Sequence, residues 1–293
     1  MTQSVPEIKE VLRSARQRFE SASIDRVDAE LVLAHVLGIE RMELHARQFQ
    51  LSPEQHELFE ELITARIAGT PTQYLVGEGP FRYLTFSVGP GVLIPRPETE
   101  LLVDAAMVEI ERLQSSPHSI PSTVSVVDLG AGSGAISISI AHEARQRNLP
   151  VHVVAVEKSE AAVEWLKKNI ARHEVDVRVI NDDVRDALVD VKCDIVVANP
   201  PYIPDNSELP KLVSEHEPEI ALLGGGEDGL EIPRNFIAAA TRILKSSGLL
   251  VLEHYENQTQ ALEQILASDY SDISHYTDLN QRPRWLMARR KER

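Results

Sequence analysis

The chain carries one short segment whose residue types suggest chemistry, Asn199-Pro200-Pro201-Tyr202. The segment follows the apolar run 195–198, which is typical of a buried strand, and a proline cannot donate a hydrogen bond to a neighbouring strand. The Asn199 side-chain oxygen and the Pro200 carbonyl can each accept a hydrogen bond, and the Tyr202 ring offers a flat face. The segment therefore predicts a rigid clamp for a planar NH2 group, with a simple proline turn as the alternative.

Such a clamp would suit an amide, whose nitrogen is a weak nucleophile because its lone pair is delocalised into the carbonyl group. Two fixed acceptors that hold both amide hydrogens would favour a pyramidal nitrogen when a methyl-sulfonium group lies in line with it. Fixed dipoles near the developing positive charge act in the same direction. The reaction would need no strong general base, since the proton can leave after the nitrogen has become cationic.

A glycine-rich turn, Gly130-Ala131-Gly132-Ser133-Gly134, precedes the clamp in the chain and follows Asp128-Leu129. Residues 125–129 predict a short buried strand and residues 135–144 predict a helix, so the glycines fall where backbone can approach a ligand closely. The spacing differs from that of a dinucleotide fingerprint and lacks the Lys-Ser/Thr of a phosphate loop. The turn indicates a nucleotide-type pocket, or else only a tight corner.

Acidic residues follow the next two predicted strands. The apolar run 151–157 ends in Glu157, which is placed to accept hydrogen bonds from ribose hydroxyls. The run 177–181 is followed by Asp182-Asp183, where an adenine amino group could be bound. A solvated glutamate and a polar turn are the alternatives. Because ligands bind at the carboxyl ends of parallel strands, we expect these residues to share one site with the clamp.

Further motifs surround these segments. They are Ile-Pro-Arg-Pro-Glu-Thr-Glu at 94–100, Glu-Pro-x-x-Ala-Leu at 217–222, Gly-Gly-x-Asp-Gly-Leu at 225–230 and Arg-Pro-Arg at 282–284. In the first motif, Glu98 and Glu100 are expected to cap a helix or to contact Arg96. With the glycine turn and the Asn-Pro-Pro-Tyr segment, this array resembles the HemK/PrmC family of peptide chain release factor glutamine methyltransferases, from about residue 28 to the end of the chain.

The resemblance implies an α/β fold of the class I S-adenosylmethionine-dependent methyltransferases. This fold is Rossmann-like, with a mostly parallel sheet and helices on both faces, and a β-hairpin would join it to a small N-terminal helical domain. The resemblance also implies methyl transfer from S-adenosyl-L-methionine, with S-adenosyl-L-homocysteine as product, to the glutamine amide of the Gly-Gly-Gln loop in class-1 release factors. The alternatives are a glutamine of a ribosomal protein, an exocyclic amine of a nucleic acid, and a cofactor-sensing or assembly protein without turnover.

The same resemblance assigns roles to individual residues. Asn199 would contact both cofactor and substrate, and it is expected to be catalytic together with Pro200 and Tyr202. Pro201 would complete the glutamine site. The expected cofactor-binding residues are Gly130, Ala131, Gly132, Ser133, Gly134, Glu157, Asp183, Val184 and Asn199. Val184 stands where many relatives carry tryptophan beside the adenine, and Glu157 replaces the usual aspartate.

Composition and charge limit the other possibilities. A formal net charge of -15 argues against general nucleic-acid binding and favours a basic protein partner. The single cysteine, Cys193, excludes an internal disulfide, and the scattered histidines lack the spacing of metal ligands. Neither a signal-peptide pattern nor an apolar run long enough for a membrane span is present, so a cytoplasmic location is expected. We also expect the protein to be a monomer.

The domain organisation follows from a change in periodicity. Residues 1–78 are helical in pattern, with helices at 28–37 and 53–68, and are expected to form a partner-binding domain. Residues 79–95 predict a β-hairpin linker, and residues 96–293 alternate strand and helix as a methyltransferase domain would. In that last part, 249–253 predicts a fifth strand, and 273–277 with 285–288 predict a closing hairpin.

Overall fold

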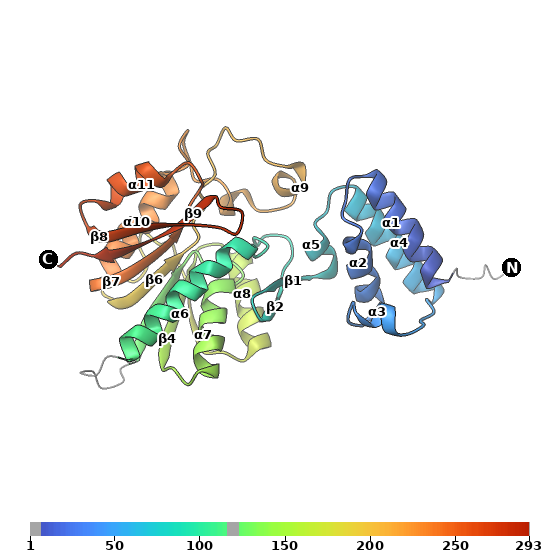
Figure 1. Cartoon of the computed structure of the whole chain (residues 1–293), viewed down its shortest axis with the longest axis horizontal. Helices are drawn as coiled ribbons and strands as arrows, with labels where there is room; N and C mark the ends of the chain where they lie inside the picture. Colours follow the sequence, from blue (N-terminus) through green and yellow to red (C-terminus); the bar gives the residue numbers. More distant parts are fainter. Residues whose placement is uncertain (1–6, 116–122, 293) are drawn as a thin grey trace. The chain divides into compact units, whose positions relative to one another are not determined.

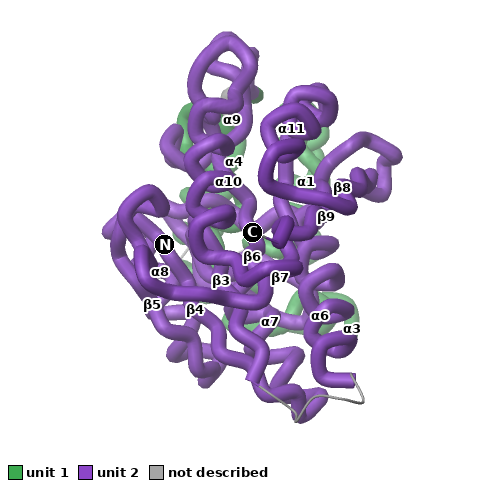
Figure 2. The backbone as a smooth tube through the Cα atoms, turned by 90° about the vertical axis from the view of Figure 1, so that its left-hand side faces the viewer, with its two compact units in different colours: residues 1–78, 210–216 green, residues 79–209, 217–293 purple. Residues whose placement is uncertain are grey.

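The computed structural model describes residues 7–115 and 123–292 (Figure 1). The chain forms two compact units, which are coloured separately in Figure 2. Unit 1 contains residues 1–78 and 210–216, and unit 2 contains residues 79–209 and 217–293. Segment 210–216 therefore belongs to the helical unit although it is far from the rest of that unit in sequence.

Unit 1 is helical. Its helices are α1 (Ile8–Ser21), α2 (Val27–Leu37), α3 (Glu43–Ala46), α4 (Pro53–Ile67), α5 (Thr72–Val76) and α9 (Lys211–Ser214). Helix α4 begins with a capping box, in which Ser52 Oγ accepts from the Gln55 N–H and the Gln55 side chain accepts from the Ser52 N–H. Phe19, Leu33 and Phe59 are fully buried between the helices and form a separate apolar core.

Unit 2 is built on a seven-stranded sheet with the strand order β5-β4-β3-β6-β7-β9-β8. The strands are β3 (Val124–Leu129), β4 (Val151–Glu157), β5 (Val177–Asn181), β6 (Cys193–Ala198), β7 (Leu244–Glu253), β8 (Tyr270–Thr277) and β9 (Pro283–Arg290). Strands β3 to β7 are parallel, whereas β9 is antiparallel to both β7 and β8. The inner strands are rich in Val, Ile and Leu because helices cover both of their faces.

The covering helices of unit 2 lie on both sides of the sheet (Figure 1). They are α6 (Glu100–Gln114), α7 (Ala135–Gln146), α8 (Glu160–His173), α10 (Glu231–Ile243) and α11 (Thr259–Leu266), with short 3-10 turns η1 (Pro97–Thr99) and η2 (Glu219–Ala221). Helices α10 and α11 bury their apolar faces in one continuous core with Val127 and Leu129 of β3. A two-stranded sheet of β1 (Glu78–Phe81) and β2 (Leu84–Ser87) precedes this part of the chain.

The class I methyltransferase architecture expected from the sequence is confirmed. The strands predicted at 151–157 and 177–181 form with those bounds, and the predicted hairpin at the end of the chain forms as β8 and β9. Pairing of Leu129 with both Val156 and Ala198 aligns the carboxyl ends of β3, β4 and β6. The loops after these strands therefore meet at one edge of the sheet.

Candidate active site

The loops at this edge of the sheet surround a cavity that lies entirely within unit 2. Most of the residues singled out in the sequence line it: Gly130, Ala131, Gly132, Ser133, Glu157, Asp183, Val184, Asn199 and Pro201. Gly134, Pro200 and Tyr202 are not among the lining residues. The expectation that the polar strand ends share one site with Asn199 therefore agrees with where these residues lie.

The glycine turn has two kinds of glycine. Gly134 has a φ of +84°, and a Cβ at this position would lie 2.5 Å from the end of the Leu166 side chain, so backbone conformation and packing together disfavour a side chain. Gly132 has a φ of +56°, but a Cβ built on it would meet no protein atom within 4 Å. Gly132 thus leaves open space beside the backbone, where a ligand can approach closely. The buried Asp128 carboxylate supports the corner by accepting from the Ser137 N–H at 3.1 Å.

Glu157 ties the end of β4 to the glycine turn. Its carboxylate accepts from the Gly132 N–H at 2.9 Å and from the Ser159 N–H at 2.8 Å. A carboxylate has about four acceptor positions, so two of them remain for hydroxyl groups in the cavity. These contacts also fix the direction in which the side chain points, as a ribose-binding residue requires.

Asp183 and Val184 also line the cavity. Asp183 accepts two hydrogen bonds from the Arg185 guanidinium, at 2.9 and 3.0 Å, and this contact holds the pKa of the Asp183 carboxyl below its ordinary value. Val184 is buried against the apolar core and also borders the cavity. Arg185, which the sequence did not single out, lines the cavity as well.

Asn199 is oriented by a chain of hydrogen bonds that starts at Thr99, which also lines the cavity, and continues to Glu253. Its Nδ2 donates to Thr99 Oγ1 at 3.0 Å, and Thr99 Oγ1 donates to Glu253 Oε2 at 2.7 Å. On the other side of the same carboxylate, the Tyr202 hydroxyl donates to Glu253 Oε1 at 3.0 Å. Among the described residues no group donates to Asn199 Oδ1 or to the Pro200 carbonyl, so both can accept from a ligand.

Glu253 at the end of β7 is only 1% exposed. Burial raises the pKa of its carboxyl to about 7, although hydrogen bonds from Thr99 and Tyr202 and the nearby Arg284 act in the opposite direction. The Tyr202 ring also stacks on Tyr255, with ring centroids 6.4 Å apart. No role was predicted for Thr99, although it lies in the motif 94–100, or for Glu253 at the end of the predicted strand 249–253, because no spacing rule connects residues so far apart in the chain.

Arg96, which lines the cavity, links the motif 94–100 to the motif 217–222. Its Nη2 donates to Glu217 Oε1 at 2.5 Å, and the Ile94 N–H donates to Glu217 Oε2 at 3.2 Å. Of the two alternatives for Glu98 and Glu100, the contact with Arg96 is wrong, because the partner of Arg96 is Glu217 and Glu100 accepts from the Arg82 N–H at 2.8 Å. The two glutamates do lie in the first turns of η1 and α6, respectively. Segments 94–96 and 217–221 are thus held together beside the cavity.

The remaining chemistry of the described residues is limited. No cluster of three or more His, Cys, Asp or Glu side chains that could hold a metal ion occurs in residues 7–115 and 123–292. Cys193 is buried, which raises the pKa of its thiol to about 12. In the part of the chain that the structure describes, no helix is both long and apolar enough to cross a membrane.

Comparison with known proteins identifies similar sequences over most of the chain. Residues 10–77 match the PrmC N-terminal domain, and residues 105–215 match the methyltransferase small domain. The chain is 38% identical to the release factor glutamine methyltransferase of Mycolicibacterium smegmatis, over 90% of each chain. It is 36% identical to the enzyme of the same name from Streptomyces coelicolor, over 94% of this chain and 95% of the relative.

A solved structure supports the fold. The T. Thermophilus 16S rRNA N2 G1207 methyltransferase, at 21% identity, superposes with a TM-score of 0.50 and covers 73% of this chain and 50% of its own. The sequence relatives extend over nearly the whole chain and include both of its units. This chain therefore belongs to the release factor glutamine methyltransferase family, as its motifs indicated.

Proposed function

We propose that this methyltransferase transfers a methyl group from S-adenosyl-L-methionine to the side-chain amide nitrogen of the glutamine in the Gly-Gly-Gln motif of class-1 release factors. The observation that carries the proposal is the orientation of Asn199. Its NH2 group donates to Thr99, so its oxygen is left to accept a hydrogen bond at the wall of the cavity. The names of the relatives support the same substrate.

The residues at the strand ends suit the cofactor. Gly132 leaves room for a ligand beside the turn, Glu157 has free acceptor positions for ribose hydroxyls, and Asp183 with Val184 offers a polar and an apolar contact for adenine. We assign the methionine part to the turn from Gly130 to Gly134. When bound, S-adenosyl-L-methionine supplies an electrophilic methyl group on a positively charged sulfur, and its product is S-adenosyl-L-homocysteine.

The clamp residues act on the substrate amide. Asn199 Oδ1 accepts one amide hydrogen, and the carbonyl of Pro200, which stands between the lining residues Asn199 and Pro201, accepts the other. Pro201 bounds the site, whereas Tyr202 does not line the cavity and supports the site through its hydrogen bond to Glu253. Fixing both hydrogens favours the pyramidal nitrogen, and the two oxygen dipoles stabilise the positive charge that develops on it. The nitrogen gains the methyl group and afterwards releases one proton to solvent.

Recognition of the partner involves more than the cavity. The net charge of -15 favours a basic protein surface over nucleic acid, and we assign partner binding to the helical residues 1–78. Free glutamine lacks this remote binding energy and is expected to be a very poor substrate. We further propose that the enzyme works as a monomer in the cytoplasm.

The test is intact-mass analysis of a purified, unmethylated class-1 release factor after incubation with the enzyme and S-adenosyl-L-methionine, followed by peptide mapping. A gain of one methyl group on the glutamine of the Gly-Gly-Gln loop is expected. A release factor in which that glutamine is replaced by alanine serves as the control and should gain nothing. If the enzyme binds the cofactor normally but the release factor stays unmodified, the proposed substrate is wrong. A glutamine of a ribosomal protein or an amine of a nucleic acid would then be the favoured substrate.

A further inference from the structure

The hydrogen bonds behind Asn199 have a defined direction. An ionised carboxylate only accepts hydrogen bonds, so the hydroxyls of Thr99 and Tyr202 must each give their single proton to Glu253. Once its proton is committed, Thr99 Oγ1 can only accept from its other neighbour, which lies 3.0 Å away. That neighbour must therefore be the NH2 group of Asn199, and the Asn199 oxygen is left for the cavity.

This direction matters because the two ends of an asparagine amide are nearly equal in shape but opposite in hydrogen bonding. With its oxygen at the cavity, Asn199 accepts a hydrogen from a substrate amide. With its NH2 group at the cavity, Asn199 would be a hydrogen-bond donor facing the NH2 group of the substrate, which is also a donor, and no hydrogen bond could form. Nothing else among the described residues holds the Asn199 amide, since its one side-chain hydrogen bond is the one to Thr99.

We infer that Thr99 and Glu253 are positioning residues for methyl transfer: through the Thr99 hydroxyl, the buried Glu253 carboxylate fixes the Asn199 amide with its oxygen toward the substrate. The inference rests on the proposed function. It extends that function to two buried residues, Thr99 being 5% and Glu253 1% exposed. Thr99 lines the cavity whereas Glu253 does not, and both act through the Asn199 amide. Tyr202 donates to the second carboxylate oxygen, so each oxygen of Glu253 accepts one hydrogen bond.

The charged and titratable groups around Glu253 come from several elements. Arg284 on β9 favours its ionised form, whereas Glu98 on η1 and burial favour the protonated form, and the Tyr202 hydroxyl donates to it from the segment after β6. Arg284 itself forms an ion pair with Asp278, with 3.5 Å between Nε and Oδ2. A proton on Glu253 Oε2 would donate to Thr99 Oγ1, free the Thr99 proton for Asn199 Oδ1 and thereby turn the amide around.

The first arm of the test compares two substitutions at one position. Thr99→Val keeps the shape but removes the hydroxyl, whereas Thr99→Ser keeps the hydroxyl and serves as the matched control. For a release factor substrate, Thr99→Val is expected to lower kcat by about 10- to 100-fold, the range for a lost oriented hydrogen bond, with KM and cofactor affinity within about 3-fold of wild type. Thr99→Ser is expected to restore most of kcat.

The second arm replaces the acid. Glu253→Gln can donate to Thr99 at all pH values and so mimics the protonated acid. Its kcat is expected to be low and to lack the rise between about pH 6 and 8 that ionisation of Glu253 causes in wild type. Burial also raises the pKa of Asp128 to about 7, but Asp128 is present in both proteins, so the difference between their pH profiles reports Glu253. Because both variants interrupt one path, the double variant Thr99→Val with Glu253→Gln should lose about as much as Thr99→Val alone, rather than the product of the two losses.

Circular dichroism and the affinity for S-adenosyl-L-methionine establish that each variant is folded before its kinetics are interpreted. If wild type methylates the release factor and Thr99→Val is equally active, the positioning roles are refuted while the proposed function stands. Equal losses for Thr99→Val and Thr99→Ser would do the same, because they would reflect packing. If the wild-type enzyme binds the cofactor but does not methylate the release factor, the proposed function fails and the inference fails with it.

Discussion

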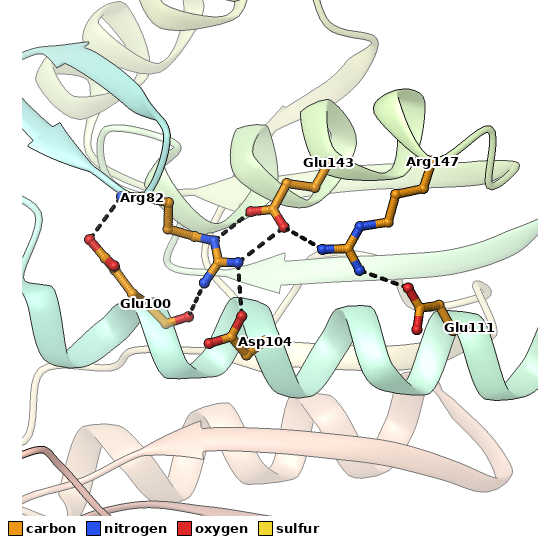
Figure 3. A network of polar contacts seen from close by, with 6 residues as sticks. All are labelled: Arg82, Glu100, Asp104, Glu111, Glu143 and Arg147. Atoms are coloured by element: carbon orange, nitrogen blue, oxygen red, sulfur yellow. Dashed lines mark hydrogen bonds and ion pairs between the residues drawn. The ribbon is translucent and has the colours of Figure 1, made fainter.

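Two buried polar networks in unit 2 use opposite chemistry. In the first, shown in Figure 3, the Arg82 guanidinium is bound by Glu143, by Asp104 and by the Glu100 carbonyl, and Arg147 continues the network from Glu143. In the second, the Glu253 carboxylate at the active site is held by two neutral hydroxyl groups, those of Thr99 and Tyr202. The first network neutralises charge, and the second directs hydrogen bonds.

The difference is visible in the pKa values. Burial would lower the pKa of Arg82, but its carboxylate partners outweigh burial and raise it. Glu109 on α6 shows the same logic in an acid: burial would raise its pKa, but Arg112 and Arg289 outweigh this and lower it to about 2. Glu253 lacks such a hydrogen-bonded cation, and its pKa rises to about 7. Ion pairing thus stabilises the fold, while the site retains a carboxylate that can still change its protonation.

Removing the cation from the first network should give the largest effect on stability. Arg82→Met removes the buried partner of the Glu143 carboxylate, which is 6% exposed and keeps only its ion pair with the more exposed Arg147. The substitution is expected to cost about 3 kcal/mol in the free energy of unfolding, the lower end of the range for a broken buried ion pair. Denaturant unfolding followed by tryptophan fluorescence measures this change in unit 2, because Trp165 and Trp285 both lie there.

The double variant Arg82→Met with Glu143→Leu is the control for this prediction. Replacing both members of a buried ion pair by apolar residues is often neutral, so most of the lost stability should return. A double variant as unstable as Arg82→Met would mean that the loss comes from packing rather than from an unpaired charge. Cofactor affinity should change little in either variant, since neither side chain lines the cavity.

A substitution in the second network should separate catalysis from stability. Asn199→Ala removes the acceptor at the cavity and is expected to lower kcat by roughly 100- to 1,000-fold, or about 3–4 kcal/mol in the activation barrier, as for other lost transition-state hydrogen bonds. Unfolding should shift little, because Thr99 keeps its hydrogen bond to Glu253. Single-turnover transfer of a labelled methyl group measures the effect, and full activity in this variant would contradict the clamp.

The sequence was sufficient for the fold and for the outline of the site. Strands β4 and β5 could be predicted with their bounds because each consists mostly of Val, Ile and Ala and ends in a polar residue, Glu157 or Asn181. Strand β7 begins at Leu244, five residues before the predicted start at 249. The prediction missed this part of the strand because residues 245–247 are polar and exposed. Strands are predicted from the spacing of apolar residues, so the polar beginning of a strand cannot be recognised in this way.

The contacts that orient the site were beyond the sequence. Arg96 pairs with Glu217, a residue 121 positions away, rather than with the neighbouring glutamates that local spacing suggested. Likewise, Thr99 and Glu253 are 154 positions apart, and only the register of the sheet and the path of η1 bring them together. The residue types of the clamp were readable, whereas the direction in which its asparagine points depends on these long-range contacts.

The pH dependence of stability distinguishes the two kinds of carboxylate with a smaller effect. The folded-state pKa of Glu253, about 7, lies above its ordinary value of 4.5, so the folded protein binds the proton more tightly. The resulting stabilisation is fully present below about pH 4.5 and is lost as the pH rises through 7. Relative to Glu253→Gln, wild type should therefore gain roughly 2 kcal/mol of unfolding free energy between pH 7.5 and 5.5.

The ion-paired Glu109 supplies the contrasting measurement. Its folded-state pKa of about 2 lies below the ordinary 4.5, so its contribution is fully present above pH 4.5 and is lost only as the pH falls toward 2. The stability difference between wild type and Glu109→Gln should therefore stay constant between about pH 7.5 and 5.5. If instead the Glu253→Gln difference were the constant one, Glu253 would be ionised throughout this range. Protonation could then not reverse the hydrogen bonds that orient Asn199, and the wild-type rise of kcat with pH would need another titrating group.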